Sequence, residues 1–500
     1  MNISNLLMYQ SRKYPDHEAI VTPQERITFN EWDMAVNQLG GNLLKAGVQK
    51  GDKFIIHMPN TKEFLYLYLA AIRIGAIAIP INAKLTESEI HYIIDHSDAR
   101  FFATHELLFD QVKNVSANNQ LACFKTGEEK ENWKSLNNLL TGDGTSIELN
   151  ATEDDEVSIL YTSGTTGNPK GVVFTHRSIL TVATMICIEM TMKKESRILH
   201  MMPLSHSAPL HLFMAAGLYV GATHVLAPTF TPDLLLNMVE KEKVTHFFGA
   251  PVAYLMTAKQ PAIENTDLSS MKYWVYGGAP LGKQEVEFVK GRFATDNLYC
   301  VYGLTEAGPN GTLLTPEEHK TKAGSVGSRA ALNCEIRLVD EHGNDVKTGD
   351  PGEIILRGEG NMKGYYKDQV KTDETLKDGW LYTGDIAKQD EDGYYWVIDR
   401  KKDIIISGGV NIYPNEVEKV LMGHPAVDDV AIVGIPHPDW GETAKAFVVL
   451  NKPVDDMENT FHTFLKEKVA SYKIPKLYEK LDALPRNMTG KLLKNKLREQ

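Results

Sequence analysis

The first third of the chain alternates between helical and strand-like hydrophobic patterns, and this alternation restricts the fold more than any other feature. Apolar side chains recur at helical spacing over residues 29–44 and 64–74, and a capping box at 86–89 opens a third predicted helix that runs to His96. Short apolar runs follow these helices, at residues 54–58, 76–81 and 100–103. Strands that alternate with helices predict an α/β fold, in which helices cover both faces of a mostly parallel sheet.

The texture of the sequence changes further along the chain. Residues 128–149 are polar and contain glycine, so we expect a surface connection there and no core element. From residue 334 short strand patterns alternate with acidic turns, which predicts a small β subdomain. A charged run at 398–403 is the best candidate for a domain boundary. After Pro414 a helix, strands at 430–433 and 446–450 and a further helix predict a compact α+β module.

A chain of 500 residues is too long for one ordinary hydrophobic core, so we expect at least two domains. Its composition, with 43% hydrophobic and 24% charged residues, is typical of a soluble globular protein. The formal net charge of −12 argues against nucleic acid or an anionic membrane as a main partner, although residues 465–500 carry ten Lys or Arg against four Asp or Glu. The scattered cysteines lack the spacing of a zinc site or a disulfide framework. Without an export signal or a long apolar run, we expect a cytoplasmic protein with no transmembrane segment.

A loop rich in glycine and hydroxyl side chains lies between two apolar runs, residues 157–160 and 171–174. Its hydroxyls and glycines are Thr162, Ser163, Gly164, Thr165, Thr166 and Gly167. Glycines allow backbone N–H groups to turn inward, the hydroxyls add donors, and Lys170 adds a positive charge, so the loop suits a nucleotide triphosphate. The common NTPase loop needs a hydroxyl directly after its lysine. Gly171 stands there instead, so a Walker-type NTPase is disfavoured.

Two further strand-like runs end in a glycine turn, one over residues 274–280 and the other over residues 299–306. Open α/β sheets bind ligands at the carboxyl ends of their strands, so both turns are candidate parts of a binding site. Glu306, in the second turn, is a hard oxygen ligand of the kind that Mg²⁺ prefers.

The order of residues 162–171 resembles the signature of the adenylate-forming superfamily, which includes acyl-CoA synthetases, firefly luciferase and the adenylation domains of peptide synthetases. The resemblance covers nearly the whole chain, with the family's motifs present in the family's order. It implies a large N-terminal domain over residues 1–399, built of mostly parallel sheets packed with helices and a small β subdomain. A hinge at 400–402 and a small mobile α+β C-terminal domain at 403–500 would follow.

The resemblance also implies which residues bind the nucleotide. Thr305, in the second glycine turn, would touch the α-phosphate, and Glu306 would hold Mg²⁺. Asp385, from a Thr-Gly-Asp segment, and Arg400 would bind the ribose. The residues expected around the adenine are Gly277, Gly278, Ala279 and Tyr302.

The remaining implied roles concern the acid and the thiol. A lone histidine is more often a packing residue than a catalyst, but His206, in a turn-like Pro-Leu-Ser-His segment, resembles the family histidine that borders the carboxylate substrate. Lys491, near the basic C-terminal end, would be the catalytic lysine, and Lys402 takes the hinge position. Gly408 and Gly409 would line the tunnel for the pantetheine arm. The acyl pocket is expected among His206, Gly278, Gly303 and Pro309.

These features predict an AMP-forming acyl-CoA synthetase that uses ATP, Mg²⁺ and coenzyme A. The carboxylic acid would attack the α-phosphate, pyrophosphate would leave, and the thiol would open the acyl-AMP. The residues near the pocket entry are small or apolar, with no obvious arginine to pair a second carboxylate. We therefore expect a small-molecule monocarboxylic acid, and specifically a medium- or long-chain fatty acid.

Alternatives stay open at this point. One is an aryl-acid CoA ligase of the coumarate or succinylbenzoate kind. Another is a stand-alone adenylation domain that loads a carrier protein, although no convincing aspartate for an amino group lies near Tyr273. A luciferase-like oxygenase would need a pocket for a large aromatic substrate, and a nucleotide-binding module without catalysis would have no need of Lys491. A homodimer is also left open.

Overall fold

The computed structural model describes residues 2–117, 121–142, 144–147, 151–162, 169–408, 410–486 and 492–499. The chain divides into two compact units. Unit 1 comprises Met1–Ile336 and Leu356–Leu381, and unit 2 comprises Arg337–Ile355 and Tyr382–Gln500. The hinge at 400–402 stays a prediction. Within the described ranges, no helix combines the length and the apolar character needed to cross a membrane.

Sheet A of unit 1 consists, from one edge to the other, of β16 (Arg329–Ala330), β15 (Thr312–Leu314), β14 (Leu298–Tyr302), β13 (Tyr273–Gly277), β12 (His246–Gly249), β10 (Arg197–His200), β11 (Thr223–Leu226), β1 (Glu18–Val21) and β2 (Arg26–Thr28). The strands from β14 to β1 pair in parallel, and antiparallel β15, β16 and β2 close the edges. The parallel strands are buried along nearly their whole length, as expected where helices cover both faces.

Sheet B of unit 1 consists of β19 (Gly364–Tyr365), β9 (Lys170–Thr175), β8 (Glu156–Thr162), β4 (Ile77–Ile81), β3 (Lys53–His57), β5 (Phe101–Thr104), β6 (Ala122–Lys125) and β7 (Trp133–Ser135). The strands from β8 to β7 are parallel, whereas β9 is antiparallel to both β8 and β19. The predicted strand, helix, strand alternation and the mostly parallel sheets are therefore confirmed.

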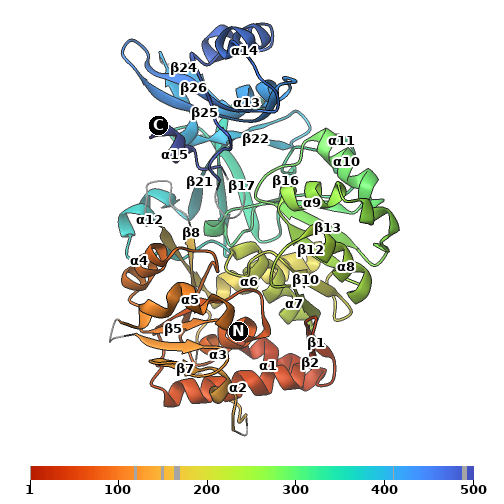
Figure 1. The fold of residues 1–500 in the computed structure, drawn as a ribbon, viewed down its shortest axis with the longest axis vertical. Helices are drawn as coiled ribbons and strands as arrows, with labels where there is room; N and C mark the ends of the chain where they lie inside the picture. The colour runs from red at the N-terminus through yellow and green to blue at the C-terminus, as the bar shows by residue number, and fades with distance from the viewer. Residues whose placement is uncertain are drawn as a thin grey trace. The chain divides into compact units, whose positions relative to one another are not determined.

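A layer of helices lies between these sheets and contacts both of them. It contains α1 (Ile3–Lys13), α2 (Phe29–Lys45), α3 (Lys62–Arg73), α6 (His176–Glu189) and α7 (Ala215–Val220). Helix α2 packs on β1 and β2 of sheet A, whereas α3 packs on β3 and β4 of sheet B. Figure 1 shows α1, α2 and α3 side by side.

Other helices lie on the outer faces of unit 1. Sheet A carries α8 (Pro232–Glu242), α9 (Pro251–Ala258) and α10 (Lys283–Phe293), and sheet B carries α4 (Glu87–Ser97) and α5 (Phe109–Val112). Helix α4 begins at the predicted capping box: the Thr86 backbone N–H donates to Glu89 Oε2 at 2.8 Å, and the Glu89 backbone N–H donates to Thr86 Oγ1. Two short helices, α11 (His319–Lys322) and α12 (Gln369–Thr375), complete the description of this unit.

The prediction of a surface connection over residues 128–149 is wrong for part of that stretch. Strand β7 joins the edge of sheet B, and the Trp133 side chain is buried edge-on against Phe102 and Phe109, at ring distances of 5.8 and 5.4 Å. One tryptophan buries enough apolar surface to hold an otherwise polar segment in the core.

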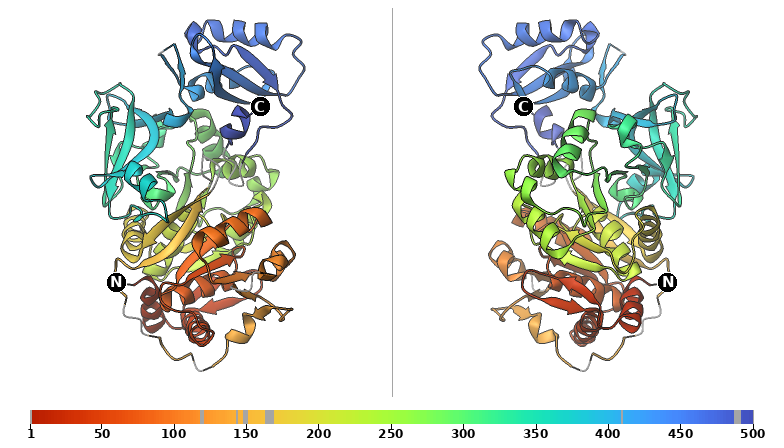
Figure 2. Two further views of the ribbon diagram at one scale, coloured as in Figure 1. Left: turned by 90° about the vertical axis from the view of Figure 1, so that its left-hand side faces the viewer. Right: turned by 90° about the vertical axis from the view of Figure 1, so that its right-hand side faces the viewer.

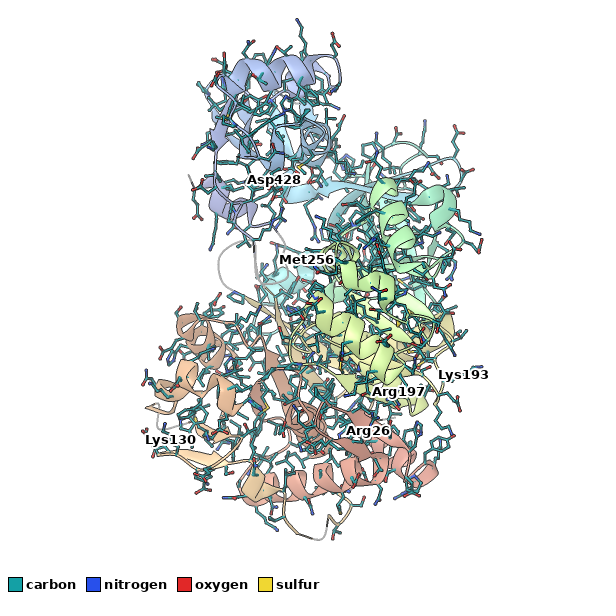
Figure 3. All side chains as sticks on the ribbon, turned by 45° about the vertical axis from the view of Figure 1, so that its right-hand side comes forward. Arg26, Lys130, Lys193, Arg197, Met256 and Asp428 are labelled. Atoms are coloured by element: carbon teal, nitrogen blue, oxygen red, sulfur yellow. The ribbon has the colours of Figure 1, made fainter. Side chains whose placement is uncertain are left out.

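A cluster of ion pairs joins β1, β2, β10 and α8. Arg26 and Arg197, both labelled in Figure 3, each bind the two carboxylates Glu18 and Glu242. Glu242 is nearly buried, and its Oε2 lies 2.8 Å from Arg26 Nη2 and 3.1 Å from Arg197 Nη2. Guanidinium groups pair with carboxylates in this way where a carboxylate loses most of its water.

The predicted small β subdomain is sheet C, with the order β17 (Cys334–Val339), β18 (Gly352–Gly358), β21 (Trp380–Gln389) and β20 (Leu376–Lys377), and with β22 (Tyr395–Arg400) paired to β21. Sheet D, in unit 2, has the order β24 (Val410–Ile412), β23 (Ile405–Ser407), β26 (Gly441–Leu450) and β25 (Val427–His437), and β27 (Leu477–Lys480) pairs with β26. The expected strands at 430–433 and 446–450 are parts of longer strands.

The two faces of sheet D are covered by different helices. Ile432 lies in a hydrophobic cluster with residues of α13 (Pro414–Met422) and α14 (Met457–Lys466). Its neighbours Ala431 and Val433 lie in a second cluster with Leu497 of α15 (Lys494–Arg498). This alternation follows the period of two along a strand. The helices α13 and α14 can be followed in blue in Figure 2, and the predicted α+β module is confirmed.

Candidate active site

The glycine-rich loop connects two antiparallel strands of sheet B. Thr162, at the end of β8, lies opposite Lys170, at the start of β9. The predicted placement between two strands is therefore confirmed. The loop residues Ser163, Gly164, Thr165, Thr166 and Gly167 lie outside the described residues, so their contact with phosphate stays a prediction.

Lys170 lies on the same face of the sheet as the tyrosine of β19. Its Nζ atom is 5.4 Å from the centre of the Tyr365 ring. Partial burial lowers the pKa of Lys170, and the nearby positive charge of Lys371 lowers it further. The carboxylates of Asp368 and Glu306 oppose this shift. An ammonium group held beside other charges in a partly dry setting is suited to a polyanionic ligand.

Glu306 lies in a short 3₁₀ helix, Thr305–Ala307, which begins three residues after the end of β14. Its Oε1 atom accepts a hydrogen bond of 2.9 Å from the Tyr365 hydroxyl, and its backbone carbonyl accepts one of 2.7 Å from the Met362 N–H. The neighbouring Thr305 hydroxyl accepts a hydrogen bond of 3.4 Å from the Ser207 hydroxyl. The structure thus brings Lys170 and Glu306 together within unit 1 through Tyr365 of β19, and Thr305 lies next to Glu306 in the chain.

The described residues contain no group of three or more His, Cys, Asp or Glu side chains that could form a complete metal cage. Mg²⁺ usually needs only one or two protein carboxylates, because phosphate oxygens and water supply its other ligands. The partly exposed Glu306, with its second carboxylate oxygen Oε2, fits this requirement.

Backbone turns at the ends of β13 and β14 place glycine where a side chain would clash. A Cβ atom at Gly303 would lie 2.6 Å from the carbonyl oxygen of Pro309, so the turn can close only on glycine. Gly278 has a φ of +84°, and Ala279 beside it is exposed. Gly277 is buried, and Tyr302 is partly exposed at the end of β14.

His206 lies ahead of a π-helix, Ala208–Met214, and its Nε2 atom is 3.3 Å from Asn82 Nδ2. Burial among neighbouring atoms lowers the pKa of His206 to about 4, although part of the ring stays accessible. The imidazole is therefore neutral near pH 7 and can accept a hydrogen bond from the Asn82 amide. Asn82 follows β4 at its carboxyl end.

The two expected ribose ligands face each other on neighbouring strands of sheet C, within unit 2. Asp385 on β21 pairs with Arg400 on β22, and Arg400 Nε lies 2.5 Å from Asp385 Oδ1. The Asp385 carboxylate is 5% exposed. Beside it, Glu353 accepts hydrogen bonds from the Gly384 N–H at 3.0 Å and from Lys401 Nζ at 2.8 Å.

The remaining candidates of unit 2 lie around sheet D. Gly408, with a φ of +58°, donates its N–H to the Trp440 carbonyl at 2.8 Å, and a Cβ atom there would lie 2.7 Å from the Trp440 ring. Lys402 lies in the 3₁₀ helix Lys401–Asp403 and is exposed. Gly409 and Lys491 lie outside the described residues.

Asn82 and Tyr365 contact the candidate residues, and sequence reasoning missed both. Asn82 follows a parallel strand. The rule that ligands bind at the carboxyl ends of strands, which selected residues 277–280, applies to Asn82 as well. Tyr365 lies in a two-residue strand without any periodic signal. Only the pairing of β19 with β9 brings it to Lys170.

Two mostly parallel sheets around a helical layer, a small β sheet and a separate α+β module are the architecture of adenylate-forming enzymes. The model of the AMP-binding enzyme family matches residues 7–366, and the model of the AMP-binding enzyme C-terminal domain matches residues 416–491. The chain belongs to this family, within its adenylate-forming CoA ligases. The resemblance seen in the sequence is confirmed.

Similar proteins support the same assignment. The chain is 34% identical to a feruloyl-CoA synthase of Amycolatopsis sp, over 98% of this chain and 97% of that protein. It is 32% identical to a long-chain-fatty-acid–CoA ligase of Mycobacterium tuberculosis, over 100% and 98%. The o-succinylbenzoate CoA synthetase of Bacillus subtilis, solved with its acyl-adenylate intermediate, superposes with a TM-score of 0.87 at 29% identity, over 99% and 98%.

Proposed function

We propose that the protein converts a monocarboxylic acid into its coenzyme A thioester in two steps, with a medium- or long-chain fatty acid as substrate. In the first step a carboxylate oxygen forms a bond to the α-phosphorus of ATP, and the bond to pyrophosphate breaks. In the second step the sulfur of coenzyme A forms a bond to the acyl carbon, AMP leaves, and the thiol proton passes to solvent.

The residues of unit 1 have roles that follow from charge. The acid and ATP are both anions, so catalysis requires cations and hydrogen-bond donors that are already in position. Lys170 would bind the outgoing pyrophosphate, and the Thr305 hydroxyl would bind the α-phosphate. Glu306 would hold Mg²⁺, which when bound neutralises phosphate charge. No protein nucleophile is needed, since the acid supplies its own oxygen.

The residues of unit 2 complete the proposal. Asp385 presents a carboxylate that can accept hydrogen bonds from two ribose hydroxyls, and Arg400 holds it in place through their ion pair. Lys491 would bind the acid and the α-phosphate during the first step. Gly408 and Gly409 would line the pantetheine path during the second step. The Trp440 ring packs so close to Gly408 that only glycine fits at that position.

The single observation that carries the substrate class is the contact between His206 and Asn82, in which the imidazole Nε2 lies 3.3 Å from Nδ2 of an uncharged amide. Burial keeps the pKa of His206 at about 4, and its described partner, Asn82, is uncharged. A neutral pair can bind or orient one carboxylate but cannot offset the charge of a second one buried beside it. Phe248, whose ring edge approaches Gly277, adds apolar surface. These features favour an uncharged acyl chain.

An aryl acid is a second candidate. The similarity to a feruloyl-CoA synthase over nearly the whole chain favours it, as does the stacking surface of Phe248, which packs on Phe213 at 5.3 Å. Both candidates share the reaction and differ only in the shape of the acid.

The test is pyrophosphate release from ATP across fatty, aryl and dicarboxylic acids, with and without coenzyme A. We expect release with medium- or long-chain fatty acids and a thioester product when coenzyme A is present. Turnover of aryl acids alone would replace the fatty acid with the second candidate. Preference for a dicarboxylic acid, or acyl-AMP that never becomes a thioester, would contradict the proposal.

A further inference from the structure

Tyr365 contacts the phosphate-loop lysine and the carboxylate expected to hold Mg²⁺ at the same time. Its hydroxyl donates to Glu306 Oε1 at 2.9 Å, and its ring centre lies 5.4 Å from Lys170 Nζ. We propose that Tyr365 is a positioning residue, which fixes the Glu306 carboxylate for Mg²⁺ and holds Lys170 beside it. The inference rests on the proposed function, since it concerns the same nucleotide.

The backbone explains why this tyrosine reaches both residues. Tyr365 lies opposite Val172 in the β19–β9 pairing, so it shares a face of the sheet with Lys170, two residues before Val172. The Tyr366 N–H donates to the Gly171 carbonyl at 2.8 Å, which fixes the register next to the lysine. The Tyr365 N–H itself donates to the Thr372 hydroxyl at 2.9 Å. The backbone at Tyr365 is therefore held by hydrogen bonds to β9 and to Thr372.

The chemistry of the phenol suits a fixed donor. The Tyr365 hydroxyl points its proton at Glu306 Oε1, and a phenol, with an ordinary pKa of about 10, is neutral near pH 7. A carboxylate has two oxygens with room for about four hydrogen bonds or metal contacts. Tyr365 donates to Oε1, and no hydrogen bond to Oε2 is found among the described residues. Fixing the rotamer before the metal arrives removes an entropy cost from Mg²⁺ binding.

The ring has a separate task. An ammonium group within about 6 Å of an aromatic ring is attracted to the ring face. This contact keeps Lys170 next to Glu306 while Lys371, on α12, repels it. Replacement of Tyr365 by Phe removes the hydroxyl and keeps the ring, whereas replacement by Leu removes both, so the two tasks can be separated.

The chain contains a matched control next to the residue. Tyr366 donates its hydroxyl to Asp98 Oδ2 at 3.0 Å on the surface of unit 1. Tyr366→Phe therefore removes a bond of the same chemistry, one residue away, without touching Glu306 or Lys170.

The experiment measures ATP binding by calorimetry at graded Mg²⁺ concentrations, without an acid substrate, so that no turnover occurs. We expect Tyr365→Phe to raise the half-saturating Mg²⁺ concentration about three- to tenfold, the change that corresponds to the loss of one ordinary hydrogen bond, and to leave metal-free ATP binding within about twofold. Tyr366→Phe should behave as the wild type. Tyr365→Leu should in addition weaken metal-free ATP binding, because Lys170 loses the ring.

A double-mutant cycle with Glu306→Gln tests whether the Tyr365 hydroxyl affects Mg²⁺ dependence through Glu306. If the hydroxyl acts through Glu306, Tyr365→Phe should change Mg²⁺ dependence by less than about twofold in the Glu306→Gln background. An unchanged or lowered half-saturating Mg²⁺ concentration in Tyr365→Phe would overturn the inference, and so would equal losses with and without Mg²⁺. If the wild type itself fails to bind ATP with Mg²⁺, the proposed function fails instead.

Discussion

His211 makes unfolding of unit 1 sensitive to acid, and replacing it should remove a defined part of that sensitivity. The ring is fully buried in the π-helix, edge-on to Phe174 at 4.6 Å, and neither nitrogen has a hydrogen-bond partner among the described residues. Burial lowers the pKa of His211 to about 3, from an ordinary value of 6.5. As the pH falls below about 6.5 the unfolded chain binds a proton that the folded protein cannot bind, so stability is lost.

The size of the effect follows from these two pKa values. Between pH 6.5 and the pKa of His211 in the folded protein, each pH unit lowers the free energy of unfolding by about 1.4 kcal/mol. Lowering the pH from 7 to 5 therefore lowers it by about 2 kcal/mol through this residue alone. His211→Phe keeps an edge-on ring pair with Phe174 and removes the proton-binding site. Any change in packing free energy is the same at each pH, so it cancels when the two pH values are compared.

The assay is urea unfolding of both proteins at several pH values from 5 to 8.5, followed by fluorescence of the buried Trp32, Trp133 and Trp274 of unit 1. The variant should lose about 2 kcal/mol less than the wild type between pH 7 and pH 5. From pH 7.5 to 8.5 the difference between the proteins should stay constant, since the imidazole is neutral in both states. A constant difference over the whole range would refute the reasoning.

Further predictions concern the site and the core. Lys491→Ala should lose acyl-AMP formation and still convert supplied acyl-AMP and coenzyme A to the thioester, whereas Lys402→Pro should show the reverse; equal losses in both steps would refute the predicted hinge. Asp385→Ala should raise the KM for ATP at least about tenfold and the KM for the acid less than about twofold, which initial rates will measure. Trp133→Ala should lower the free energy of unfolding of unit 1 by about 3 to 5 kcal/mol in the same assay, because β7 then loses its buried side chain. A loss under about 1 kcal/mol would support a surface position for residues 128–149 instead.

Long periodic segments were predictable from the sequence because their hydrophobic spacing is a local property. The hydrophobic spacing predicts helix α2, and the capping box, which is also a local signal, predicts the start of α4. The burial of Trp133 could not be predicted in this way. A single tryptophan in a polar stretch has no periodic spacing, and its ring partners come from strand β5 and helix α5. Residues 128–149 are mostly polar, so their sequence predicts exposure, whereas tertiary packing buries Trp133.

The residues of the candidate site likewise fall into those that local motifs predict and those that only tertiary contacts reveal. The order of motifs was readable, and the structure places Lys170 and Glu306 in one unit and pairs Asp385 with Arg400 in the other. Tyr365 was not predictable, because its importance depends on a two-residue strand that joins sheet B from a distant part of the chain. A contact of this kind exists only in three dimensions.

That distant strand has a consequence for how the protein is made. Val173 of β9 pairs with Gly364 of β19, which emerges from the ribosome roughly 190 residues later, about 10 to 40 s at ordinary rates of synthesis. Throughout that interval the outer edge of β9 has no partner from β19, and an unpaired strand edge is where chains associate wrongly. The nascent chain therefore has a vulnerable period that ends only when β19 has been synthesised.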